Sequence, residues 1–123
     1  MFKHIIFLLI YLIFFVSCAK DKNKLDTLEL HKDVEGDMIA AYKEGMKQLE
    51  MGDGLFASKK FDEAEILFPQ SIWAPKASLM SAYALYSQNY YDDALFNLER
   101  HIKRYPKDNN LVYAHYLIAI CYF

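Results

Sequence analysis

Side chains that could do chemistry are few in this sequence, and their spacing assembles no catalytic or metal-binding site. The histidines are scattered, without the close His or Cys spacing that a metal site needs. Asp62, Glu63 and Glu65 could act as acids, but they are expected on the solvated outer side of a short helix, where no cleft is implied. No Gly-rich phosphate loop or serine nucleophile motif occurs. The sequence therefore predicts no enzyme, no metal and no cofactor.

One cysteine lies at the end of an apolar N-terminal segment. The uninterrupted apolar run, residues 5–16, has 12 residues, whereas a membrane-spanning helix needs about 20. Lys3 precedes the run, and Ser17, Cys18 and Ala19 follow it. This order of charged, apolar and small residues is typical of a secretory signal. Residues 1–17 are therefore predicted to be a signal peptide that is removed.

The residues that lead up to and include that cysteine, Phe15-Val16-Ser17-Cys18, resemble the lipobox of bacterial lipoproteins. Phe15 departs from the pattern, in which leucine is commonest. The resemblance implies that Cys18 becomes an acylated N-terminus, and two or three acyl chains anchor a protein far more firmly than one. Ala19, in place of an aspartate, implies delivery to the outer membrane. A plain secretory signal and a buried N-terminal helix are the alternatives.

Charge and cysteine content restrict the partners. After residue 17 the chain has 13 basic and 16 acidic residues, a net charge of about −3, so nucleic acid is not an expected partner. These 106 residues suffice for one small domain. Cys121 has no intramolecular partner if Cys18 is acylated, and its apolar surroundings predict a small buried core residue.

Residues 18–36 are predicted to form a lipidated tether. The segment is polar and mixed in charge, and its isolated leucines form no sustained stripe at helical spacing. A flexible tether would let the folded part stand away from the lipid surface. An arm that docks on the domain through Leu25, Leu28 and Leu30 is the alternative.

Residues 37–123 show apolar residues at helical spacing. Asp37 is the expected N-cap of a first helix, whose apolar face continues to Phe56 with Asp53 filling a missing position. A second, short helix follows and ends at Pro69. The two helices are expected to pack as a hairpin.

The hairpin pattern then repeats. A second hairpin ends at Pro106, and the first helix of a third hairpin begins near Asn110. Aligning Phe61 with Tyr91 gives a spacing of 30 residues, and such periods indicate a helical solenoid. The small residues expected to let the helices approach closely are Gly52, Ala82, Ala119, Ala64 and Ala94. The pattern resembles the tetratricopeptide repeat, so the predicted fold is an all-α solenoid of about two and a half such repeats. Because it ends within an uncapped apolar helix, the chain is expected to be truncated.

First helices line the concave surface of such a solenoid. The expected groove residues are Leu49, Phe56, Lys76, Leu79, Tyr83, Tyr86, Tyr113 and Tyr116, together with Asp53 and Ile120. An extended peptide with aromatic side chains could insert them between the tyrosines, and Lys76 could pair with a terminal carboxylate. The alternative is that several of these aromatic residues pack between repeats and meet no ligand.

A lipidated cysteine, a polar tether and repeats of this type resemble the BamD family of outer membrane assembly lipoproteins. Residues 68–106, with FPQSIWAPKASLMSAYALYSQNYY and a closing RYP, are similar to the family's first-to-second repeat passage. The resemblance implies a non-enzymatic lipoprotein on the periplasmic face of the outer membrane. It also implies BamA and the other assembly-machine subunits as partners, through C-terminal repeats that are absent here, and unfolded β-barrel proteins as substrates.

Two other readings stay open. One is a different scaffold lipoprotein with the same repeats, in pilus assembly or cell division. The other is a nutrient-binding lipoprotein of the SusD-like type, although that class is much longer and has large inserted loops.

Overall fold

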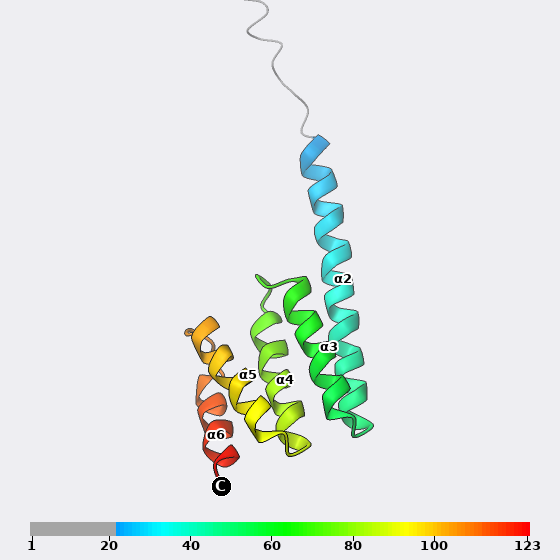
Figure 1. Ribbon diagram of the computed structural model, residues 1–123. Coiled ribbons are helices and arrows are strands. Elements are labelled where there is room, and N and C mark those ends of the chain that lie inside the picture. The colour runs from blue at the N-terminus through cyan, green and yellow to red at the C-terminus, as the bar shows by residue number, and fades with distance from the viewer. Residues whose placement is uncertain (1–21) are drawn as a thin grey trace, which may run out of the picture. The chain divides into compact units, whose positions relative to one another are not determined.

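The computed structural model describes residues 22–123, with side chains from Leu30 onward, and this range is helical (Figure 1). Its helices are α2 (Lys22–Glu50), α3 (Gly54–Leu67), α4 (Ala74–Ser87), α5 (Tyr91–Arg104) and α6 (Leu111–Cys121). Consecutive helices from α3 to α6 pack against each other as a series of hairpins, which confirms the predicted all-α hairpin fold. The predicted signal peptide and Cys18 lie outside the described residues. None of the helices in residues 22–123 combines the length and hydropathy needed to cross a bilayer.

The chain divides into two units at Leu30 and His31, and the packing described below is that of the second, His31–Phe123. Helix α2 begins earlier than expected, at Lys22, so Asp37 lies within it and the prediction that Asp37 caps it is wrong. The physical reason is that residues 22–36 contain no proline and only one glycine, Gly36, which costs a helix about 1 kcal/mol. The lipidated tether itself stays a prediction.

A tight turn ends α2 at Glu50, so the expected continuation of this helix to Phe56 is wrong. Gly52 has a φ of 83°, in the left-handed region that glycine adopts at little cost. Asp53 then caps α3, because its Oδ1 accepts a hydrogen bond of 2.9 Å from the backbone N–H of Phe56. Phe56 therefore belongs to the second helix, and the apolar spacing across the turn is a coincidence.

The repeat length is 37 residues, and the predicted spacing of 30 is wrong. Helices α3 and α5 begin at Gly54 and Tyr91, and α4 and α6 are separated by the same offset. At this offset Phe61 corresponds to Leu98, and both side chains are fully buried. Tyr91 instead starts its helix, where it is 40% exposed, so it is not the counterpart of the fully buried Phe61.

The small residue at the first helix crossing is Gly45. A Cβ on Gly45 would lie 2.9 Å from the ring of Phe61, which leaves no room for a side chain. Ala82 follows it by one repeat and is fully buried. Gly52, which the sequence analysis placed in this role, lies in the turn instead.

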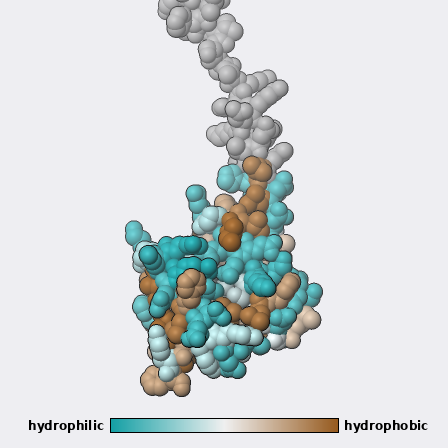
Figure 2. All heavy atoms as spheres, in the orientation of Figure 1, coloured by the Kyte–Doolittle hydropathy of each residue, from teal (hydrophilic) through white to brown (hydrophobic). Residues whose placement is uncertain are grey.

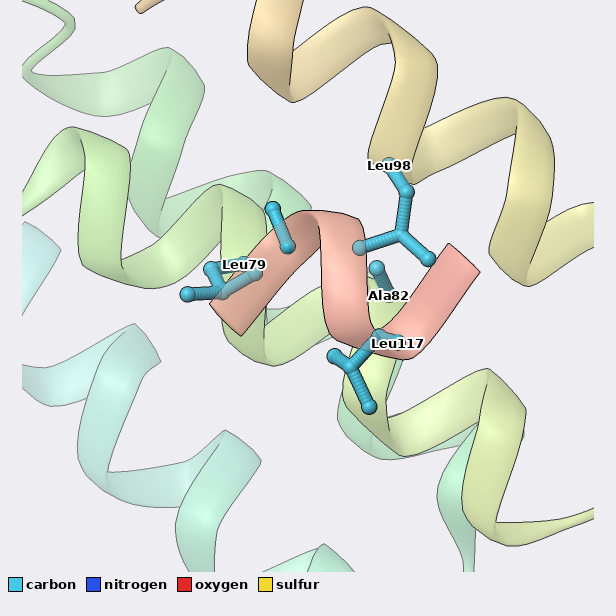
Figure 3. Packing of buried hydrophobic residues seen from close by; sticks show 5 residues of the cluster. Leu79, Ala82, Leu98 and Leu117 are labelled. Carbon is cyan, nitrogen blue, oxygen red and sulfur yellow. The ribbon is translucent and has the colours of Figure 1, made fainter. Parts of the chain in front are cut away.

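The core is a row of clusters between successive helices. Figure 3 shows the last of them, where Leu79 and Ala82 of α4 meet Leu98 of α5 and Leu117 of α6. The clusters nearer α2 are built from Met38, Ala41, Ala64 and Ala77, and from Ala57, Phe61 and Ala84. The surface in view in Figure 2 is mostly hydrophilic, with hydrophobic side chains in several separate patches.

Two Gly-to-Ala substitutions should have opposite effects on stability. A Cβ on Gly54 would overlap the backbone carbonyl oxygen of Ala84, so Gly54→Ala should lower the free energy of unfolding by about 1–3 kcal/mol. Gly36 has no neighbouring atom within 4 Å of such a Cβ, so Gly36→Ala should raise it by about 0.5–1 kcal/mol. Urea unfolding followed by circular dichroism measures both changes. Parental stability of Gly54→Ala would contradict the close approach of α3 and α4.

Candidate peptide-binding groove

Four of the predicted groove residues form a tyrosine cluster, defined here as Tyr83 and Tyr86 of α4 with Tyr113 and Tyr116 of α6. The ring centroids of Tyr83 and Tyr86 lie 6.5 Å apart, and the rings of Tyr113 and Tyr116 are stacked at 6.2 Å. Burial raises the pKa of Tyr113, and the nearby phenols of Tyr83, Tyr116 and Tyr86 raise it further. The two helices therefore present one aromatic surface. Tyr113 and Tyr116 keep 42% and 57% of their surface exposed, which leaves their rings free to contact a ligand.

A second feature lies on α2 and was not among the predicted groove residues. It is a pocket of about 440 Å³, called the α2 pocket here and lined by Met38, Ile39, Tyr42, Lys43, Met46, Lys47, Glu50 and Trp73. The ring of Tyr42 stands edge-on to Trp73, with the centroids 5.5 Å apart. Burial raises the pKa of Tyr42, so its hydroxyl stays protonated at neutral pH.

Two lysines line this pocket, and a third lies beside the ring of Trp73. Lys43 and Lys47 line it, with Glu50 as the acidic residue on the same helix. Lys76, a predicted groove residue, places its Nζ 4.6 Å from the ring centroid of Trp73, a cation–π geometry that orients its charge. The pocket therefore offers an aromatic and methionine surface beside positive charge.

The remaining predicted groove residues lie elsewhere. Leu79 is buried in the core between α4, α5 and α6, and Leu49 packs against the cluster around Phe61. Phe56 lies on α3 with Lys60 Nζ 5.8 Å from its ring. Phe56 was misplaced because the first helix was expected to continue through the turn at Gly52.

With the correct repeat length, the sequence would have indicated two residues of the α2 pocket. Shifting Tyr116 back by two repeats of 37 residues gives Tyr42, and shifting Tyr83 back by one gives Met46. Trp73 carried a weaker signal, because it belongs to the turn before α4 and not to a helix face.

An ion-pair network on the second helices fixes one hairpin against the next. The side chain of Glu65 is almost fully buried, accepting hydrogen bonds from Arg104 Nη1 at 2.7 Å, Arg100 Nη2 at 3.3 Å and the Tyr105 hydroxyl at 2.8 Å. Burial, together with the Glu65 carboxylate, raises the pKa of Tyr105 to about 12. The expectation that Glu65 lies on a solvated face is therefore wrong. Glu65 joins α3 to α5 and so helps set the spacing between the first two hairpins.

Comparison with known proteins places the chain in a family. Residues 34–123 match the family model YfiO, described as outer membrane lipoprotein. The chain belongs to the YfiO/BamD family. This confirms the resemblance found in the sequence.

Three relatives are named outer membrane protein assembly factor BamD. The protein from Caulobacter vibrioides is 39% identical over 82 residues, which are 67% of this chain and 27% of the relative. The protein from Rickettsia prowazekii is 28% identical over 102 residues, 83% of this chain and 39% of the relative. The protein from Xylella fastidiosa (strain 9a5c) is 28% identical over 76 residues, 62% and 26% of the two chains. The chain thus spans between a quarter and two fifths of the length of these relatives. No solved structure gave a significant match.

Proposed function

We propose that this BamD-family chain acts in outer membrane protein assembly as a non-enzymatic lipoprotein that binds segments of unfolded β-barrel proteins. Its family membership and the names of its relatives support the assembly role. The lipid on Cys18 anchors it to the periplasmic face of the outer membrane. BamA and the other subunits of the machine are its proposed protein partners.

The observation that carries substrate binding is the presence of two aromatic surfaces, the α2 pocket and the tyrosine cluster, on first helices of successive hairpins. In an extended peptide, side chains on one face recur every second residue, so neighbouring aromatic side chains can occupy successive surfaces. Each ring offers a large apolar area, and the tyrosine hydroxyls can meet the peptide backbone.

The charges near Trp73 suggest how the peptide is oriented. Lys76 is held over the Trp73 ring, and Lys43 and Lys47 line the adjacent pocket. A terminal carboxylate that follows an aromatic residue would bring a negative charge to these lysines while its ring enters the α2 pocket. Peptides that end in a free aromatic residue are therefore the proposed ligands.

Site-specific photo-crosslinking tests this proposal in cells that carry the lipidated protein. A photoreactive residue at Tyr83 or Met46 should capture β-barrel precursors, and peptides from the C-termini of those precursors should compete with capture. The matched control is Phe96, which is 67% exposed on α5 and lies outside both surfaces. Capture of pilus or cell-wall proteins in place of precursors would favour the scaffold alternative, and equal capture from Phe96 would contradict the groove.

A further inference from the structure

A buried histidine in the second hairpin has no part in the groove. His101 of α5 is fully buried and follows Ala64 by one repeat of 37 residues. In the first hairpin Ala64 packs in an apolar cluster between α2 and α4. One repeat later, Ser78 of α4 takes the place of Ala41, and Ala114 of α6 takes the place of Ala77. Both residues are fully buried. The second hairpin therefore carries an ionisable ring where the first carries a methyl group.

The imidazole of His101 faces the loop that connects α5 to α6. Its Nε2 lies 3.2 Å from Asp108 Oδ2, so the imidazole contacts that carboxylate. The backbone N–H of Asp108 donates to the carbonyl of Tyr105, and its carbonyl accepts from the N–H of Leu111, the first residue of α6. Asp108 therefore links the imidazole to the start of α6.

The other charged groups that act on His101 are Glu65 of α3 and Arg100 of its own helix, and the Tyr105 ring lies 5.5 Å away. Burial is the largest influence and lowers the pKa of His101 below its usual value. Asp108 and Glu65 oppose this shift, and Arg100 adds to it. The ring is therefore neutral in the folded protein at neutral pH.

We propose that His101 and Asp108 form an acid-sensitive latch that holds the loop of residues 105–110 and the first turn of α6 against α5. A buried imidazolium is less well solvated than one in water, so acid favours an opened state in which the ring is hydrated. Tyr113 lies in the first turn of α6. Opening of the latch therefore changes the tyrosine cluster.

The sign of the pH dependence follows from linkage. The pKa of His101 is lower in the closed state than in an opened, hydrated state, where it is about 6.5. The stability of the closed state is therefore complete above about pH 6.5, and it decreases as the pH falls below that value towards the closed-state pKa. Within this window the opening equilibrium constant rises as the pH falls, by at most about tenfold for each pH unit.

Amide hydrogen exchange of the purified chain tests the latch. The probe is the amide of Ala114, which donates to the carbonyl of Asn110 in the first turn of α6. After correction for intrinsic exchange, its protection factor should fall as the pH decreases below about pH 6.5, by at most about tenfold per pH unit, while α3 amides change little. Unchanged protection between about pH 7.5 and about pH 5 would overturn the proposal.

Three variants assign the effect to His101. His101→Gln should abolish the pH dependence, whereas His115→Gln, at an exposed site on α6, should retain it. If His101→Gln does not fold, Asp108→Asn gives an independent test: it should raise opening at neutral pH and keep the dependence below about pH 6.5. Persistence of the pH dependence in His101→Gln, or its loss in Asp108→Asn, would overturn the latch. This readout needs no substrate, so it does not depend on the proposed function.

Discussion

Replacing Phe61 with alanine is expected to lower the free energy of unfolding by about 3–5 kcal/mol. The ring is fully buried where α2, α3 and α4 meet. It lies edge-on to Tyr42 with the centroids 5.2 Å apart, and it fills the space opposite Gly45. Its removal leaves a cavity that neither the glycine nor the surrounding alanines can fill. Urea unfolding followed by circular dichroism measures the change.

The matched control is Phe96→Ala, which removes the same atoms from a ring that is 67% exposed. This variant should change stability by no more than about 0.5 kcal/mol. Similar losses in both variants would contradict the assignment of Phe61 to the core and of Phe96 to the surface. Because the Phe61 ring also packs against Tyr42, which lines the α2 pocket, the Phe61 variant should also change the shape of that pocket.

The second large effect is expected in binding, from Trp73→Ala. The ring is half-buried, forms one wall of the α2 pocket and lies beneath the charge of Lys76. Partly buried tryptophans that meet a partner are typical binding hot spots, where alanine costs about 2 kcal/mol or more. The affinity for a peptide with a free C-terminal phenylalanine should therefore fall about thirtyfold. Fluorescence anisotropy of a labelled peptide measures this affinity. Intrinsic tryptophan fluorescence would not serve, because Trp73 is the only tryptophan of the chain and the variant lacks it.

Ile72→Ala is the control for this substitution. Ile72 precedes Trp73 in the same turn, and its side chain is 77% exposed and lines no part of the α2 pocket. It should leave the affinity close to that of the parent. Amidation of the peptide C-terminus should weaken binding to the parent, and Lys76→Gln should reduce this difference. Parental affinity of a folded Trp73→Ala variant would show that the peptide does not use the α2 pocket.

The α2 pocket and the tyrosine cluster belong to different hairpins, so their separation depends on how the hairpins are joined. Glu65 reaches across from α3 to Arg100 and Arg104 of α5, and the apolar clusters fix α4 on both sides. A peptide that contacts both surfaces therefore meets a prearranged spacing, which reduces the ordering cost of binding.

The sequence by itself determined the helical fold, its hairpin pattern and the family. Apolar spacing defines helix faces, and Pro69 and Pro106 end helices because proline lacks an N–H and cannot continue them. The same spacing placed the tyrosines of α4 and α6 on helices that lie side by side, and their role in a groove stays a prediction. These features are local, so they can be read from short stretches of chain.

Only the tertiary structure decided the repeat length, the α2 pocket and the buried charges. The break at Gly52 depends on its left-handed backbone, and Asp53 then caps α3. The apolar spacing by itself runs through this break. Trp73 reaches the pocket and Glu65 meets Arg104 only because successive hairpins pack together. Such contacts join residues more than 20 positions apart in the chain. They are determined by how the helices pack against each other, and the periodicity of a single helix carries no information about this packing.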